Sequence, residues 1–228
     1  MTSQNLRSIE SRIRDACRRA GRERKDVRLL PVTKTRSIAA VQQMYDLGLR
    51  DFGESRVQEL LEKKTALSAD IRWHFIGHLQ SNKVRQIASF ISSVQSIDSI
   101  ETARELAKRA AEHQRVIRIL VEVNISGEAQ KQGVAPRDVQ ALVVQIVETC
   151  PSLVVAGLMG MASLEEDLGR TRPQFRILRE LRNEIQERQP QLKSFTELSM
   201  GMSNDFEIAI EEGATIVRIG SALFASDE

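Results

Sequence analysis

A lysine ends a short apolar stretch in the segment RLLPVTKTR at residues 28–36. An amine such as that of Lys34 forms Schiff bases with aldehydes when it is partly desolvated and has cationic neighbours such as Arg36. The alternative is that Lys34 only marks the point where a strand meets water. Where the fold places Lys34 relative to other polar groups decides between the two interpretations.

Two segments near the C-terminus carry residue types that bind anions. These residues are Ser199, Gly201 and Ser203 in SMGMS, and Arg218, Gly220 and Ser221 in RIGS. A glycine turn before a helix brings backbone N–H groups close to an anion, and a guanidinium suits a phosphate or a ring acceptor. Each segment alone is also compatible with a turn, a helix cap or a surface ion pair. A lysine together with a phosphate cup indicates a phosphorylated aldehyde, for which pyridoxal 5′-phosphate is the obvious candidate.

Strand-like and helix-like segments alternate along the whole chain. Predicted strands cover residues 29–33, 51–53, 73–77, 93–97, 116–124, 153–160, 194–199 and 215–220, and predicted helices cover residues 3–20, 37–48, 55–67, 80–89, 98–113, 136–149, 170–188 and 203–213. Apolar strands with helical crossovers indicate a parallel sheet covered on both faces. Eight such units predict one (β/α)8 TIM-like barrel, a single domain over residues 1–228. The alternative is an open doubly wound sheet, which needs a glycine-rich loop after the first strand, and residues 31–37 contain no glycine.

The barrel gives Lys34 a context. Active sites of such barrels lie at the C-terminal ends of the strands, and phosphate is often held by the loops after the seventh and eighth strands. Lys34 ends the first predicted strand, SMGMS follows the seventh and RIGS closes the eighth. The three segments are therefore predicted to converge at one end of the barrel.

Composition excludes several classes of protein. The net charge is +2 over 228 residues, which gives no nucleic-acid footprint. Residues 1–28 hold nine Arg/Lys against four interspersed Asp/Glu, typical of a solvated helix rather than a transit peptide, with a nucleic-acid surface as the minor interpretation. Cys17 and Cys150 are predicted to be free thiols. No apolar run reaches membrane-span length and no signal peptide is evident, so we expect a cytoplasmic protein without membrane contact.

The histidines are weaker candidates. His74 and His78 have HxxxH spacing, but they run from a strand into a loop and do not share a helix face, so we expect no zinc site. Residues 74–83 are either a strand that turns into a Ser-capped helix or a wall of the site.

Other polar and sulfur-containing residues also fall at predicted strand ends. Glu54 and Ser55 follow the second strand and are expected to face the same rim. Met159 and Met161 end the sixth strand and are expected to pack rather than react. In DSIE at residues 98–101, Asp98 is predicted to cap the next helix with Glu101.

Six segments carry a resemblance to a known family that covers nearly the whole chain. They are PVTKT at 31–35, FGESRVQE at 52–59, HFIGHLQSNK at 74–83, GLMGM at 157–161, ELSMGMSND at 197–205 and VRIGS at 217–221. With these segments the chain resembles the YggS/PROSC family of pyridoxal phosphate homeostasis proteins. Two positions depart from the family pattern: Ser55 stands where asparagine is common, and Ala225 where glycine is common.

The resemblance implies a barrel like the N-terminal domain of alanine racemase, with pyridoxal 5′-phosphate held as an internal aldimine on Lys34. The phosphate would lie against the SMGMS and RIGS segments, and Arg218 would contact the phosphate or the pyridine nitrogen. The positions implied to contact the cofactor are Lys34, Ser55, Met159, Ser199, Gly201, Ser203, Arg218, Gly220 and Ser221.

The main hypothesis is a protein that holds pyridoxal phosphate and serves its homeostasis, as a monomer with pyridoxal-phosphate-dependent apoenzymes as partners. The rival is an amino-acid racemase-like enzyme. A two-base racemase needs a second acid/base, which alanine racemases take from a tyrosine of a second domain that is not expected here. Tyr45 is expected to pack in the core, which leaves a base such as His78 to the rival. An arginine at the ring nitrogen would also weaken the ring as an electron sink.

Overall fold

Eight parallel strands form one sheet that curls into a barrel in the computed structural model, which describes residues 2–128, 130–163 and 169–224. Ala225 lies outside these residues. The strands are β1 (Arg28–Pro31), β2 (Asp51–Glu54), β3 (Arg72–Phe75), β4 (Ser93–Ile97), β5 (Ile117–Val123), β6 (Leu153–Gly160), β7 (Glu197–Ser199) and β8 (Ile216–Ile219). The sheet runs β1-β8-β7-β6-β5-β4-β3-β2. A parallel bridge between Val32 and Gly53 joins β1 to β2. The predicted (β/α)8 barrel is confirmed.

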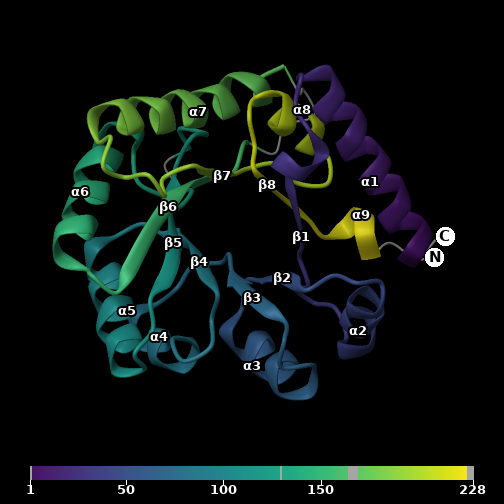
Figure 1. The fold of residues 1–228 in the computed structure, drawn as a ribbon, viewed down its shortest axis with the longest axis horizontal. Helices are drawn as coiled ribbons and strands as arrows, with labels where there is room; N and C mark the ends of the chain where they lie inside the picture. Colours follow the sequence, from purple (N-terminus) through teal and green to yellow (C-terminus); the bar gives the residue numbers. More distant parts are fainter. Residues whose placement is uncertain (1, 129, 164–168, 225–228) are drawn as a thin grey trace.

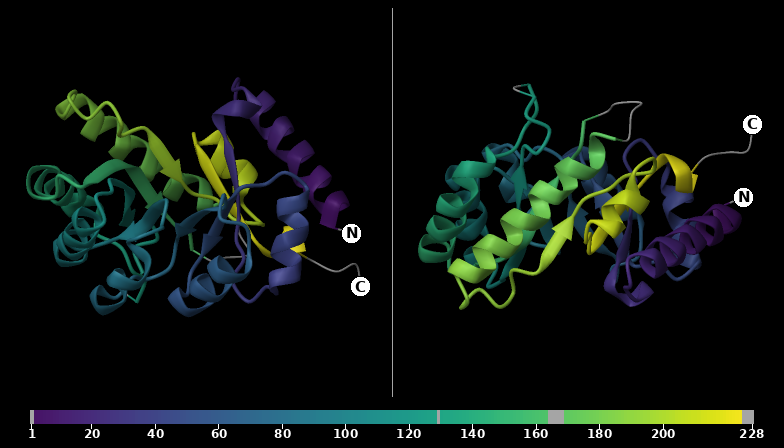
Figure 2. Two further views of the ribbon diagram at one scale, coloured as in Figure 1. Left: turned by 60° about the horizontal axis from the view of Figure 1, so that its bottom comes forward. Right: turned by 90° about the horizontal axis from the view of Figure 1, so that it is seen from above.

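The helices surround the strands (Figure 1). They are α1 (Thr2–Arg19), α2 (Ile38–Asp46), α3 (Val57–Ala66), α4 (Ser81–Ile87), α5 (Ile100–Glu112), α6 (Val139–Thr149), α7 (Thr171–Arg188), α8 (Phe206–Glu211) and α9 (Ser221–Phe224), with 3-10 helices η1 (Arg24–Asp26) and η2 (Pro136–Asp138). Figure 2 shows residues 124–128 and 130–135, between β5 and η2, projecting beyond the strands. None of the helices in the described ranges has the length and apolar character needed to cross a bilayer.

Alternation along the strands creates two apolar layers. Outward-facing side chains such as Phe52 and Phe75 pack under the helices. A separate inner cluster fills the barrel and consists of Leu30, Leu120, Ala156, Met159 and Ile216. Successive side chains of a strand point to opposite faces, so a strand residue two positions from an inner residue also faces inward.

Two predicted helix starts are wrong. Ser99, and not Asp98, caps α5, because its hydroxyl accepts a hydrogen bond from the Thr102 amide. α8 begins at Phe206 instead of 203, since the side chain of Asp205 turns back to accept the Met202 amide at 2.5 Å.

The basic first helix is paired with acids rather than left free. Ile9 and Ile13 face the core, and Arg12 and Arg19 each lie 2.7 Å from a carboxylate of α8, Glu207 and Glu211 respectively. This agrees with the interpretation of α1 as a solvated amphipathic helix. Cys17 and Cys150 are buried and free, as predicted.

Candidate functional site

Lys34 lies at the C-terminal end of β1 with its side chain exposed. Leu30 faces the barrel interior, so Val32 has the same inward parity, and Lys34 follows in a turn just beyond the strand. The next residue, Thr35, has φ +62°, which is unusual for a β-branched residue. Backbone strain of this kind persists only where the surroundings enforce it.

A buried ion pair holds the segment that carries Lys34. The Lys63 ammonium on α3 donates to Glu54 Oε1 at 2.5 Å and to the Thr33 carbonyl at 2.6 Å. Glu54 also accepts from the Thr33 hydroxyl at 2.9 Å and the Ser55 amide at 2.8 Å. Thr33, before Lys34, and Ser55, after β2, are thereby both hydrogen-bonded to the Glu54–Lys63 ion pair.

The other side of Lys34 is held by the same helix. Glu59 on α3 accepts the amide of Thr35 at 2.7 Å and lies 3.2 Å from the Lys63 ammonium. These contacts lower the pKa of Glu59, against a desolvation effect that is the largest single influence and acts in the opposite direction. The strained residue after Lys34 is therefore anchored by a carboxylate that stays ionised.

Arg218 is a buried cation inside the barrel. Its guanidinium donates to Ser199 Oγ at 2.8 Å and to the Gly160 carbonyl at 3.0 Å, and Ser199 Oγ donates to Gln95 Oε1 at 2.7 Å. Burial lowers the pKa of Arg218 to about 10, and it remains charged at neutral pH. No carboxylate of the described residues forms an ion pair with it. Glu122 and Asp205 act on this charge without forming an ion pair with it. A buried cation without an ion-pair partner is costly, so this site is suited to an anion or a strong acceptor.

The loops after β7 and β8 meet through two serines. The hydroxyl of Ser221 donates to Ser203 Oγ at 3.0 Å, and the Ala222 amide donates to the same oxygen at 3.3 Å. Gly201 has φ +93°, and a Cβ there would lie 2.5 Å from Ala209 Cβ, so only glycine fits. The two anion-binding segments predicted from the sequence thus converge.

The remaining predicted positions divide into a rim and a floor. Ser55 and Gly220 are partly buried at the rim. Ser199 and Met159 are buried within the barrel, with Ser199 held by Gln95 and Arg218. Glu54, expected beside Ser55 at the rim, instead faces α3 and is fully buried. Successive strand residues point to opposite faces, so only one of this pair can face the mouth.

Sequence reasoning missed Glu122. This carboxyl is 3% exposed and lies on β5 at the same parity as inward-facing Leu120, opposite Met159 of β6. Burial and, to a smaller extent, the nearby Asp98 raise its pKa, Arg218 lowers it, and the net result is a pKa of about 7. The sequence signal that could have identified Glu122 was an acidic residue inside the apolar strand IRILVEV, at a position of inward parity.

The histidines and Tyr45 lie away from this arrangement or at its edge. His74 belongs to the opposite, N-terminal end of the barrel, where its Nε2 lies 2.8 Å from Asp51 Oδ1 beside a cavity of about 350 Å³. His78 is exposed, with Nδ1 3.9 Å from an oxygen of Asp98. The Tyr45 hydroxyl lies 2.8 Å from Asp70 Oδ1 in the segment that precedes β3. No group of metal-ligating side chains occurs in the described ranges.

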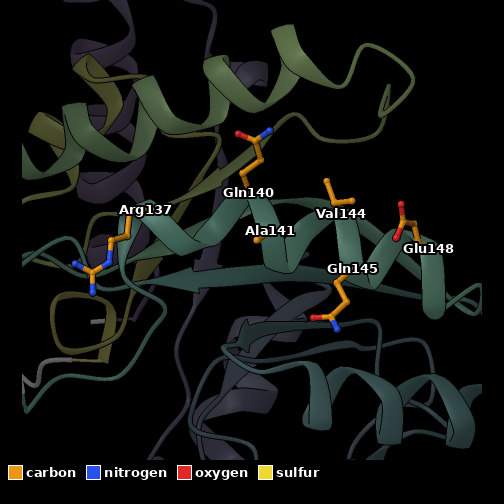
Figure 3. Close-up of a pocket in the computed structure, with 6 residues that line it drawn as sticks. All are labelled: Arg137, Gln140, Ala141, Val144, Gln145 and Glu148. Carbon is orange, nitrogen blue, oxygen red and sulfur yellow. The ribbon is translucent and has the colours of Figure 1, made fainter.

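A larger hollow lies on the outer helical layer (Figure 3). It measures about 520 Å³ and is lined by Arg137, Gln140, Ala141, Val144, Gln145 and Glu148. All six belong to η2 or α6, so none stands at a strand end. This hollow is separate from the Lys34 site.

Comparison with known proteins decides the family. Residues 4–227 match the alanine racemase N-terminal domain family. A pyridoxal phosphate homeostasis protein of Aquifex aeolicus is 44% identical over 222 residues, which cover 97% of this chain and 96% of the relative. The chain belongs to the pyridoxal phosphate homeostasis protein family.

Solved structures agree with this family. PipY of Synechococcus elongatus, solved with PLP bound, is 33% identical with a TM-score of 0.85, covering 99% of this chain and 100% of PipY. An alanine racemase of Clostridium difficile is 14% identical with a TM-score of 0.77, and the match covers 98% of this chain and 58% of the racemase. The second likeness shows a shared barrel fold.

Proposed function

We propose that this chain binds pyridoxal 5′-phosphate at the C-terminal end of the barrel and serves its homeostasis without sustained catalytic turnover. The observation that carries the proposal is the exposed Lys34 amine at the same end as Arg218, a buried guanidinium that no carboxylate of the described residues pairs with. The relatives named for pyridoxal phosphate homeostasis, and PipY with PLP bound, support the choice of cofactor.

The residues present fit this cofactor. The Lys34 amine would attach the aldehyde carbon with loss of one water. Ser203 and Ser221, with the close backbone approach that Gly201 and Gly220 allow, would hold the phosphate. Arg218 would face the phosphate or the ring nitrogen.

The other positions would border the ring. Ser55 would lie at its side, and Ser199 and Met159 would form the floor beneath it. When bound, pyridoxal phosphate supplies an electron sink for amino-acid chemistry.

The groups around the site support the proposal that the protein holds the cofactor rather than using it in catalytic turnover. An arginine at the ring nitrogen does not supply the proton that strengthens the electron sink. Tyr45, which could have served as a second base, points toward Asp70 instead. His78, exposed and near Asp98, is the base that a racemase-like activity would require. We expect pyridoxal-phosphate-dependent apoenzymes to be the partners that receive the cofactor.

Two assays on the purified, cofactor-loaded protein test the proposal. Incubation with a panel of L-amino acids, followed by chiral analysis, is expected to give at most one equivalent of product per chain. Mixing with a pyridoxal-phosphate-dependent apoenzyme is expected to restore that enzyme's activity. Multiple turnovers that are lost in Lys34→Ala but retained in Tyr45→Phe would overturn the non-catalytic assignment and favour the racemase-like alternative.

A further inference from the structure

Glu122 is a buried residue whose carboxyl forms no hydrogen bond with the described residues, although its oxygens are not among the completely enclosed ones. The residue is 3% exposed and lies on β5 two positions after Leu120, which belongs to the inner apolar cluster. Its register partner on β6 is Met159, whose own partner on β7 is Ser199, the residue that holds Arg218. The carboxyl therefore shares the interior of the barrel with the Arg218 guanidinium.

An unpartnered buried carboxyl is costly when ionised. Burial and the negative charge of Asp98 both favour its neutral form, whereas Arg218 favours the anion, and the balance gives a pKa of about 7. Glu122 thus changes its charge near neutral pH in a region that already holds one buried cation.

The charged groups around Glu122 define its surroundings. Asp98 follows β4, and one of its oxygens lies 3.9 Å from His78 Nδ1. Arg218 lies on β8, and the charge of Asp205, at the start of α8, raises its pKa. From the segment after β5, Lys131 pairs with Glu128 at 2.6 Å. From β6 the neighbour is Met159, which does not titrate. Arg218 is the cation that shifts the Glu122 equilibrium toward the anion.

A ligand anion and an ionised Glu122 would both interact with the Arg218 charge. In the protein interior, charges interact more strongly than in water, so a ligand anion near Arg218 repels an ionised Glu122. The neutral carboxyl has no such repulsion and offers an O–H donor to the ligand.

We propose that Glu122 is a proton-linked residue of the ligand site, so that a phosphorylated pyridine ligand binds together with one proton held by the Glu122 carboxyl. This inference rests on the proposed function, since it concerns the same site. It makes cofactor retention weaken as the pH rises above neutrality, without any change of fold.

Titration calorimetry with pyridoxine 5′-phosphate tests the inference, because this ligand lacks the aldehyde and leaves Lys34 chemistry out of the signal. Binding to the wild type and to Glu122→Gln would be measured between pH 6 and pH 8 in buffers of different ionisation enthalpy, which counts the protons taken up. The ratio of wild-type to variant Kd is expected to rise about tenfold from pH 6 to pH 8, as for one site with a pKa near 7. At pH 8 the wild type is expected to take up nearly one proton more than the variant.

Glu101→Gln serves as the matched control, because it changes an exposed acid on α5 and is expected to behave as the wild type. Equal proton uptake by the wild type and Glu122→Gln would overturn the inference while leaving the proposed function intact. Failure of both to bind the ligand would instead count against the proposed function. If Glu122→Gln does not fold, Glu122→Met, which has a similar size and cannot titrate, takes its place. Protons exchanged by the ligand's own phosphate and ring nitrogen then cancel in the difference, and equal uptake contradicts the inference.

Discussion

The position of Lys34 depends on buried residues that lie away from the mouth of the barrel. Glu54 and Lys63 are both buried, and their ion pair holds the backbone at Thr33 and Ser55. Removing one member of such a pair leaves an uncompensated charge, which typically costs about 3–5 kcal/mol.

Glu54→Gln is therefore expected to lower the free energy of unfolding by about 3 kcal/mol or more and to weaken cofactor retention. Chemical denaturation and equilibrium dialysis would measure the two effects. Glu62→Gln on the exposed face of α3, the helix that carries Lys63, is the control and should stay within about 0.5 kcal/mol of the wild type. A Glu54→Gln variant as stable as this control would show that the buried pair does not anchor the segment.

Individual residues also show where sequence reasoning ends. The order of the segments was enough to predict that the loops carrying Ser203 and Ser221 meet, because strand ends of a barrel share one face. Lys34 follows β1, the strand that pairs with β8. The inward position of Glu122 and the outward position of Glu54 depend on the register of each strand, which short apolar segments do not define.

At the scale of elements, the end of β3 packs against the residue after β2. A Cβ on Gly77 would lie 2.2 Å from the Ser55 carbonyl oxygen, and the Ser96 hydroxyl donates to the Gly77 carbonyl at 2.5 Å. The contact is backbone on backbone, so no side-chain movement can relieve it.

Gly77→Ala is expected to displace Ser55 and reduce stability by about 1–3 kcal/mol, with weaker cofactor binding. Gly48→Ala is the matched control: its φ of +95° makes alanine strained, but a Cβ there meets nothing within 4 Å. Both variants should lose stability in thermal unfolding, and only Gly77→Ala should lose affinity for the cofactor. Equal affinities would mean that this contact does not position the rim.

Elements were predicted better than their ends. The alternating pattern identified all eight strands and the crossover helices, since each apolar stretch is bounded by polar turns or glycine. The starts of α5 and α8 were misplaced because serine, aspartate and the turn before the helix compete for the same amide groups.

At the scale of the whole molecule, the two ends of the barrel respond to pH in opposite ways. At the N-terminal end, Arg72 and His74 hold the pKa of Asp51 well below its usual range, although desolvation, its largest single influence, acts the other way. The stability from Asp51 is present above its unfolded pKa of about 3.9 and is lost as the pH falls below it. The raised pKa of Glu122 acts inversely: the folded state retains this proton, and stability declines as the pH rises from about 4.3 toward 7.

Without cofactor, Glu122→Gln is therefore expected to flatten the decline in stability between pH 5 and pH 8, by a few kcal/mol at most, since one pKa unit corresponds to about 1.4 kcal/mol. Urea denaturation at several pH values would measure it. Asp51→Asn should instead reduce the loss of folding stability that the wild type shows below pH 4. Parallel profiles for the wild type and Glu122→Gln would show that this carboxyl titrates as in the unfolded chain.

The central claim is that Lys34 carries pyridoxal 5′-phosphate. Its most direct test is to load the purified protein with the cofactor, reduce it with borohydride and locate the modified residue by mass spectrometry. We predict a stable pyridoxyl adduct on Lys34 and loss of the visible absorption band on reduction. A protein that takes up no pyridoxal phosphate, or one that carries the adduct on another lysine, would contradict the account.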